Sequence, residues 1–554
     1  MKRIAIGSVI VLALAVLSYV ALRGQSFWIP LGPGRIKAVP AGDQEIAWIA
    51  PATSGEGWER LVKAVRVLAG QWQEIHGGVP LLLDTDRAFL PLTADVPEIG
   101  LHFPKSGTLW IRWYKLSGGN DAEHWINKLK RRSTPPLAIV GGDTSDRALA
   151  LAEILERVRN SWHGTAPLLL ITTATADRYL PAGQPELEFH NDEWPRLMAV
   201  YPGRSFRYAF TNTHMVEAML DFVVQRPSVW PERPKADDPK APPFFLFTLT
   251  WLDDGYSKDL AYSFQKLYSS FIREKLGKDA TIPSDEDFVQ YSIGDYYQPN
   301  PREEMAVGLF LANAARRGDQ PQLLVLPTGT QRARRFLRTL CRRAPAELRD
   351  IVVANGDSIS FNSLYRDRDV AWNVQDMPVP LIVFCHRNPI DPASGFGAKE
   401  PGSERIDTTS TQDLLLFRDL VESVVLASFK DGELLDDADA VLERLRTVQW
   451  LGTGIILAPD AVAGATAPIV PSVRSAGAEG IPFFDAEGNR TPGTGEHIVW
   501  LKPTFEGNRV LPEASLGIFR MERLRTRTVW QRVGEPLPVY YDRSGEKEAV
   551  HDGR

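Results

Sequence analysis

This chain of 554 residues has few of the residues that bind metals or crosslink small secreted domains. It contains two cysteines, Cys341 and Cys385, and nine scattered histidines. Their spacing matches no metal site. An oxidising compartment would allow a disulfide between the two thiols, and two inert buried thiols are the alternative. We expect no metal ion and no cofactor.

The chain also lacks a large excess of charge of either sign. The 63 lysines and arginines are set against 69 aspartates and glutamates, for a net charge of -6. This balance disfavours a nucleic-acid partner, because nucleic-acid-binding domains usually carry a basic face. One local exception is a helix-like run with arginines at 332, 334, 335, 338, 342 and 343. We interpret it as a solvated helix face, with an acidic docking partner as the alternative.

The common catalytic motifs are missing as well. The chain has no Gly-x-Ser-x-Gly elbow, no helix-opening Gly-x-Gly-x-x-Gly and no His-Glu-x-x-His. The segment 326–330, Leu-Pro-Thr-Gly-Thr, lacks the lysine of a phosphate-binding loop. His102, His124 and His386 stand alone and are expected to be structural or exposed. The sequence therefore predicts a protein that is not an enzyme.

The first feature that is present is an apolar run from Ile4 to Leu22 behind Lys2 and Arg3. Its length suits a bilayer span, and the positive charges before it favour translocation of everything that follows. A cleaved signal peptide needs small residues before the cleavage point, and the end of this run fits that rule badly. We expect a signal-anchor at 1–25, a Gly- and Pro-rich tether at 26–44, and a membrane-anchored protein facing the periplasm or cell exterior.

Apolar strand-like segments then alternate with amphipathic helices, which predicts mostly parallel sheets covered by helices on both faces. Two such units follow each other, and the chain returns afterwards. We predict an α/β protein of two lobes, one formed by 45–209 with 381–478 and the other by 210–380 with 479–520, and a tail at 521–554. The expected strands are 45–50, 109–114, 137–140, 167–172, 244–250, 322–326, 350–354 and 380–385; the expected helices are 57–75, 121–132, 145–160, 213–225, 257–272, 302–316, 331–343 and 411–429.

The ends of the expected strands carry the candidate ligand-binding residues, because loops and helix starts converge at that edge of a parallel sheet. Hydroxyls and free amides there suit a carboxylate or another anion, and the alternative is that they are helix caps. In the second unit an acidic residue would face a ligand ammonium, with a turn and a helix cap as the alternative. The candidates are Ser54, Thr144, Ser145, Thr172, Thr173, Ala174 and Thr175 in the first unit, and Tyr256, Asp357 and Ser358 in the second.

Six segments in a fixed order resemble the type I periplasmic binding proteins. The similarity is greatest to the branched-chain amino acid substrate-binding components of ABC transporters and to related receptor ectodomains. It runs from Ile46 to Leu501. The segments are 46–55 with the Pro-x-x-Ser-Gly turn, 139–145 (Ile-Val-Gly-Gly-Asp-Thr-Ser), 168–177, 205–208 (Ser-Phe-Arg-Tyr), 254–257 and 480–490.

The resemblance implies two lobes joined by three crossovers, near 206–212, 379–386 and 474–480, that close over a small ligand such as an amino acid. Uptake through a membrane permease or sensing through an envelope signalling partner would follow. The chain departs from the family by inserts near 76–108, 226–243, 277–300 and 386–410, and by Ser257 in place of a glycine. The alternative is a regulatory interaction module of the cell envelope that keeps the fold without the ligand.

Overall fold

The computed structural model describes residues 36–76, 80–90, 92–104, 106–179, 194–230, 244–276, 288–293, 301–317, 320–343, 351–359, 379–389, 411–430, 432–452, 455–457, 480–506, 509–523, 528–534 and 537–540. The predicted anchor and most of the predicted tether lie outside these ranges. Among the helices in these ranges, none is both long and apolar enough to cross a membrane.

The first lobe is built on one mixed sheet. Its parallel part runs from β4 to β7, as the continuous apolar strands predict. β2 and β3 are antiparallel additions at the β4 edge, and they lie in the insert at 76–108, where we predicted no strand. In the described residues the order is β2 (Leu82–Asp84), β3 (Glu98–Phe103), β4 (Gly107–Leu116), β1 (Gln44–Pro51), β5 (Ala138–Gly141), β6 (Leu168–Ile171) and β7 (Ser205–Arg207).

The second lobe repeats this plan. Strands β12 to β9 are parallel, and an antiparallel group extends the sheet beyond β12. In the described residues the order is β20 (Thr528–Arg532), β19 (Arg509–Arg523), β18 (His497–Glu506), β12 (Leu381–Cys385), β11 (Ile351–Asn355), β10 (Gln322–Val325), β8 (Phe245–Trp251) and β9 (Phe288–Ile293), with β21 (Leu537–Tyr540) paired to β19.

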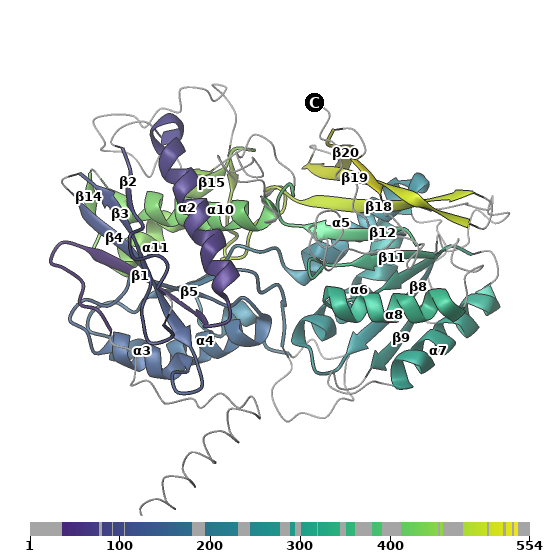
Figure 1. Cartoon of the computed structure of the whole chain (residues 1–554), viewed down its shortest axis with the longest axis horizontal. Helices are drawn as coiled ribbons and strands as arrows, with labels where there is room; N and C mark the ends of the chain where they lie inside the picture. The colour runs from purple at the N-terminus through teal and green to yellow at the C-terminus, as the bar shows by residue number, and fades with distance from the viewer. Residues whose placement is uncertain are drawn as a thin grey trace, which may run out of the picture.

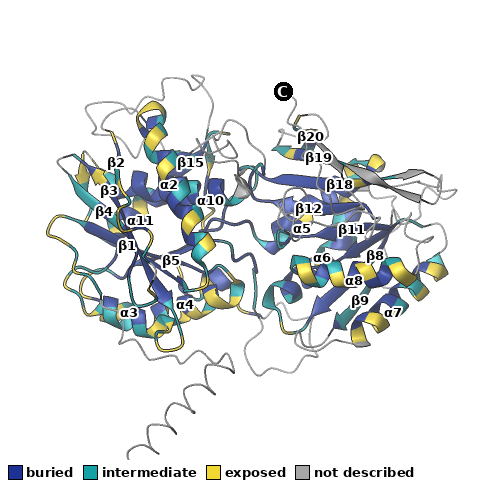
Figure 2. Cartoon of the chain, viewed as in Figure 1, coloured by how far each residue is buried: buried dark blue, intermediate teal, exposed yellow. Residues whose placement is uncertain are grey.

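Helices cover both faces of each sheet, as predicted (Figure 1). Figure 2 shows buried strands and helices that are buried on one side and exposed on the other. In the first lobe, α2 (Gly55–His76), α10 (Thr411–Ser428) and α11 (Ala438–Leu445) cover one face, and α3 (Ala122–Lys130) and α4 (Ser145–Arg157) cover the other. In the second, the pairs are α7 (Pro301–Arg317) with α8 (Thr330–Arg343), and α5 (Asn212–Gln225) with α6 (Gly255–Leu276).

Short elements complete the first lobe and its connections. They are the hairpin β13 (Phe429–Lys430) and β14 (Glu433–Leu434), the small sheet β16 (Ile455–Leu457), β15 (Val448–Trp450) and β17 (Ile481–Pro482), and the single turns η1 (Arg159–Ser161), η2 (Leu197–Ala199) and η3 (Pro227–Val229).

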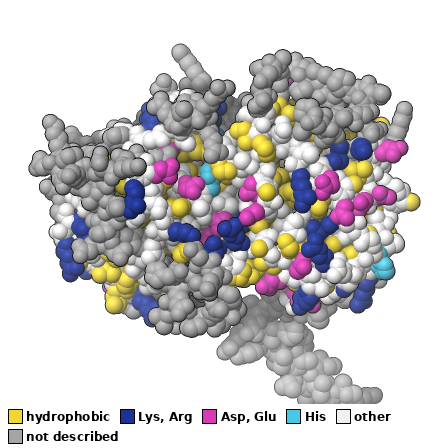
Figure 3. All heavy atoms as spheres, turned by 180° about the vertical axis from the view of Figure 1, so that it is seen from behind, with side chains coloured by type: hydrophobic (Ala, Val, Ile, Leu, Met, Phe, Trp, Pro, Cys, Tyr) yellow, Lys and Arg dark blue, Asp and Glu magenta, His cyan; other side chains and the backbone are white. Residues whose placement is uncertain are grey.

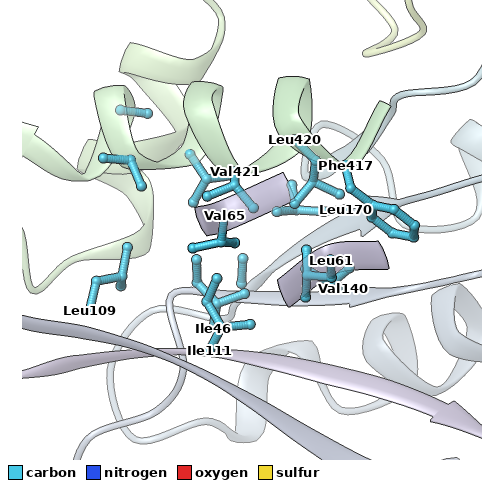
Figure 4. Close-up of a cluster of buried hydrophobic side chains, with 14 of the residues drawn as sticks. Ile46, Leu61, Val65, Leu109, Ile111, Val140, Leu170, Phe417, Leu420 and Val421 are labelled. Carbon is cyan, nitrogen blue, oxygen red and sulfur yellow. The ribbon is translucent and has the colours of Figure 1, made fainter. Parts of the chain in front are cut away.

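The core of the first lobe explains why the chain must return to it. Leu61 and Val65 of α2 point with Leu420 and Val421 of α10 toward the strands, where Ile46 and other apolar side chains meet them (Figure 4). Fully burying one such side chain contributes about 1.5–3 kcal/mol. α10 therefore supplies a layer of the core that the first 209 residues leave uncovered.

The structure moves two of the predicted boundaries and keeps a third. β12 pairs with β11 and β18 in the second sheet, so the first lobe resumes after Cys385 and not at 381. Phe483 and Phe484 pack in the first-lobe core, which places the third crossover between Phe484 and β18, not at 474–480. The first crossover joins β7 to α5, as predicted.

The tail that sequence patterns left unplaced belongs in part to the second sheet. β19 runs to Arg523, and β20 and β21 pair with it. Trp530 of β20 is fully buried in the core against α5. The two cysteines are both free, and Cys385 is buried inside β12.

Candidate functional site

The edges of the two sheets that carry the predicted residues face each other across the lobes. α4 and α6 both begin at this interlobe edge. Their first turns meet so closely that a Cβ atom on Gly255 would lie 2.9 Å from Oδ1 of Asp146. The structure therefore brings both groups of predicted residues to one region, each on its own side.

Three first-lobe candidates are bonded within their own lobe. The hydroxyl of Ser54 lies 3.4 Å from a carboxylate oxygen of Asp143. Thr144 is the N-cap of α4 and accepts a bond at 3.4 Å from an amide of the first turn. The hydroxyl of Ser145 accepts a bond from the amide of Ala176 at 3.2 Å. The cap interpretation is thus correct for Thr144.

The candidates after β6 are also engaged. The hydroxyls of Thr172 and Thr173 donate to the carbonyls of Gly141 and Asp143, at 3.4 and 3.0 Å. Ala174 and Thr175 are buried. These bonds join the loops after β5 and β6 into one rigid edge. Most of the hydroxyls predicted to bind an anion are therefore already hydrogen-bonded within the first lobe.

A side chain that we did not predict joins the two lobes. Asp259, on the first turns of α6, is almost fully buried. Its carboxylate accepts bonds from the backbone amides of Asp177 and Arg178 on the first lobe, at 2.8 and 3.0 Å. It also accepts a bond from the side-chain amide of Asn212 in the first crossover, at 2.8 Å. A carboxylate of the protein thus occupies amides that would suit a ligand carboxylate.

Burial raises the pKa of Asp259 to about 7, and the negative charge of Asp177 adds to the rise. The amide bonds from Asp177, Arg178 and Asn212 oppose it, because they favour the ionised form. This interlobe contact therefore changes its charge near neutral pH.

The second-lobe candidates Asp357 and Ser358 lie after β11. The hydroxyl of Ser358 donates to the carbonyl of Thr328 at 2.8 Å. Asp357 lies 2.8 Å from Nε2 of His386. Nδ1 of the same ring accepts the amide of Phe210 at 3.1 Å, so we assign the ring proton to Nε2, which donates to Asp357. His386 is buried, so of the two roles expected for it, structural or exposed, it has the structural one.

Tyr256 presents a buried hydroxyl beside these groups. Oη meets the geometry of a hydrogen bond to no group in the described part of the chain. It lies against Gly356, where a Cβ atom would come within 2.2 Å of Oη, so a larger residue at 356 would displace the tyrosine hydroxyl. Burial and the charge of Asp357 raise the tyrosine pKa well above its usual value. A buried polar group left without a partner costs about 1–3 kcal/mol, which a bound ligand would recover.

Two first-lobe side chains complete the region. Arg60 of α2 forms an ion pair with Asp413 in the first turn of α10, with N and O 3.1 Å apart. The pKa of Asp413 is raised by burial and by the charge of Asp357, and is lowered again by Arg60 and His386. The carboxylates of Asp413 in the first lobe and Asp357 in the second therefore repel each other. This arrangement favours a cationic group between them.

Sequence reasoning missed Asp259, Asn212, Arg60 and Asp413. One signal was present. Asp259 and Asp413 are charged residues in the first turns of helices, next to the apolar positions that face the core. Such residues need a partner when they are buried. The partner itself could not be read from the sequence, because it lies far away along the chain.

Buried ion pairs also hold the crossovers. Asp419 of α10 lies 3.0 Å from a guanidinium nitrogen of Arg387 and 3.8 Å from one of Arg490. Burial lowers the pKa of Arg490 to about 10 and raises that of Asp419. Glu496 accepts a bond from His214 in the same region, at 2.8 Å. Buried ion pairs thus fix the second and third crossovers to α10, and a hydrogen bond fixes the third crossover to α5.

Neither protein-family models nor curated protein sequences match this chain. Three similar solved structures are an ABC transporter substrate-binding protein from Desulfitobacterium hafniense, a putative branched-chain amino acid ABC transporter from Rhodospirillum rubrum, and the LpoA (YraM) C-domain from Haemophilus influenzae, a regulator of PBP1A. The identities are 12%, 14% and 11%, and the TM-scores are 0.44, 0.43 and 0.35. The matches cover 85%, 84% and 84% of this chain, and 99% of each of the other chains.

These solved structures include type I periplasmic binding proteins, the class that the sequence resemblance names. The chain itself has two α/β lobes with parallel-rich sheets, which fits the fold of that class. The identities are low and the TM-scores are below 0.5, so these structures do not show what this protein binds.

Proposed function

We propose that this chain is a membrane-anchored extracytoplasmic binding protein, and not an enzyme, that holds a small ammonium-bearing ligand such as an amino acid between its lobes. The observation that carries the proposal is the buried hydroxyl of Tyr256, which has no hydrogen-bond partner among the described residues and lies beside Asp357 at the interlobe edge. A ligand that donates to Asp357 and pairs with Tyr256 would satisfy both groups.

The charges support a cationic group on the ligand. Asp357 and Asp413 repel each other, and a ligand ammonium between them would relieve that repulsion. Arg60 is the nearby cation for a ligand carboxylate, because a guanidinium bonds carboxylates through two parallel donors. Ser54 and Thr173 would contribute only if their present bonds were exchanged for bonds to the ligand. Such a protein would deliver its ligand to a permease or report it to a signalling partner.

Replacing Tyr256 by Phe tests the site. We expect the variant to keep its thermal stability, because the hydroxyl forms no hydrogen bond of good geometry to the residues that the structure describes. We expect it to bind the ligand about tenfold more weakly, the equivalent of about 1.4 kcal/mol. A thermal-shift screen of the twenty amino acids and of simple amines would identify the ligand, and titration calorimetry would give both affinities.

Tyr268→Phe is the matched control, because that hydroxyl donates to the carbonyl of Phe244 inside the second lobe. It should lower stability and leave affinity unchanged. If no amino acid or amine raises the melting temperature, or if both variants bind like the original protein, the proposed site is wrong.

One observation favours a second function, an interaction module that has lost its ligand. Asp259 already occupies the amides of Asp177 and Arg178, and the first-lobe hydroxyls are bonded internally. In that case the lobes would stay closed without any ligand. Small-angle scattering with and without the amino acids that pass the screen separates the two functions, since only a ligand-binding protein would change shape.

A further inference from the structure

The pair α7 and α8 forms an outer face of the second lobe with an unusual charge. In the described residues of these helices, six arginines are exposed and Glu304 is the only exposed carboxylate. The whole chain, by contrast, is acidic overall. On the face opposite to the view of Figure 1, Lys and Arg are intermixed with Asp and Glu (Figure 3). The exposed arginines are Arg302, Arg316, Arg335, Arg338, Arg342 and Arg343.

Local bonds hold several of these guanidinium groups in place. Arg343 donates to the backbone carbonyl of Glu304 at 2.9 Å, which bridges the two helices. Arg342 donates to the carbonyl of Arg338 and to the hydroxyl of Thr339. In the described residues neither Arg342 nor Arg343 has a carboxylate partner, so no paired negative charge offsets theirs there. An arginine that is already positioned loses less conformational entropy when it binds an anion.

The same face carries two exposed apolar side chains. Met305 and Leu309 lie one turn apart on α7, with 62% and 37% of their surface exposed. Figure 2 shows the exposed turns of α7 and α8 side by side on the near face of the lobe. A short apolar strip bordered by arginines suits a helix that is acidic on its flanks and apolar along one stripe.

The face is separate from the interlobe site. α8 begins at the interlobe edge, where Arg332 pairs with Asp253 at 3.3 Å. The helix then runs back along the sheet, so that Arg338, Arg342 and Arg343 lie on its far half. A partner bound there would leave the interlobe edge uncovered.

We infer that the α7–α8 face docks an acidic amphipathic segment of a partner protein. Carboxylates would pair with Arg338, Arg342 and Arg343, and an apolar side chain would cover Met305 and Leu309. A lipid surface suits the face less well, because its described residues present two exposed apolar side chains and no exposed aromatic ring, which gives little to insert into a bilayer.

The test uses the full chain and a fluorescein-labelled twenty-residue helical peptide of glutamates with leucines on one stripe. A second peptide with glutamine in place of glutamate is the charge control. By fluorescence anisotropy, we expect the glutamate peptide to bind at least tenfold more tightly than the glutamine peptide. Its affinity should fall as salt is added, because ionic strength screens the attraction.

Two variants locate the binding face. The triple change Arg338→Glu, Arg342→Glu and Arg343→Glu should weaken binding at least tenfold. Met305→Ser with Leu309→Ser should weaken it without changing the charge. The matched control is Arg131→Glu with Arg157→Glu, two exposed first-lobe arginines at the ends of α3 and α4, and it should bind like the original protein. Circular dichroism checks that each variant is folded.

Three outcomes would overturn the inference. The glutamate peptide does not bind, the triple variant binds it as well as the original protein does, or the first-lobe control weakens binding equally. Vesicles of phosphatidylglycerol form the last arm. If they bind in a way that the triple variant abolishes while the peptide does not bind, the face recognises an anionic membrane and not a protein.

Discussion

Asp259→Ala is expected to loosen the contact between the lobes. The change leaves the amides of Asp177 and Arg178 and the side chain of Asn212 without their acceptor. Above its pKa of about 7 the carboxylate is ionised. Hydrogen bonds to a charged group contribute about 1.5–3 kcal/mol each, so at such a pH the loss of even one corresponds to at least tenfold more frequent opening. Hydrogen exchange at 177–178 should accelerate by that factor, and small-angle scattering should show a larger radius of gyration.

Glu274→Ala is the matched control for this prediction, because Glu274 is an exposed carboxylate on the same helix. It should change neither exchange nor shape. An Asp259→Ala protein that exchanges at the original rate at 177–178 would show that other contacts keep the lobes together. One such contact is the approach of Trp194 to Tyr262, whose ring centres are 6.0 Å apart.

The same residue predicts a pH dependence. Its pKa is raised from 3.8 to about 7 in the folded protein, so the folded state keeps the proton over a range in which the unfolded chain has lost it. The stability from this group is full below pH 3.8 and is lost as the pH rises through 7. At about 1.4 kcal/mol per pKa unit, the change amounts to about 4 kcal/mol. Denaturant unfolding between pH 4 and 8 should show a flatter slope for Asp259→Asn, and an identical slope would contradict the assignment.

Asp419→Ala is expected to be the most destabilising single change described here. It leaves the buried guanidinium groups of Arg387 and Arg490 without their counter-charge at the crossovers. Removing one partner of a buried ion pair costs about 3–5 kcal/mol. Guanidinium chloride unfolding would measure the loss as a shift of the midpoint.

Glu123→Ala is the surface control. Glu123 pairs with Arg157, both side chains are at least half exposed (50% and 59%), and exposed pairs contribute about 0–1 kcal/mol. Adding Arg387→Met to Asp419→Ala should recover part of the loss, because it removes one of the two stranded charges. If Asp419→Ala unfolds within 1 kcal/mol of the original protein, water must reach these arginines.

Much of the fold could be predicted from local patterns. Helices α2, α6 and α8 begin and end within four residues of their predicted bounds. Their apolar positions recur with the helical period, which depends only on neighbours along the chain. The strands that are apolar throughout are parallel and covered on both faces, as expected. β2 escaped prediction because it is a mostly exposed edge strand of three residues, and β3 was missed with it.

The sequence predicted where the candidate site lies, but it did not predict which hydrogen bonds its side chains form. The ends of β5, β6, β8 and β11 do meet across the lobes. A hydroxyl after a strand, however, binds a ligand or its own loop with equal chemical ease. Thr173 is bonded to the carbonyl of Asp143 because β5 and β6 are neighbours in the sheet, a fact of packing.

The sequence by itself determined the class of elements, their order and the alternation that requires two covered sheets, since these follow from hydrophobic period and chain connectivity. Only the tertiary structure decided that β12 belongs to the second sheet, that the tail completes it, and that Asp259 closes on Asp177 and Arg178. Those outcomes depend on contacts between residues far apart in the chain, whose energies come from burial and charge in the packed protein and leave no periodic trace in the sequence.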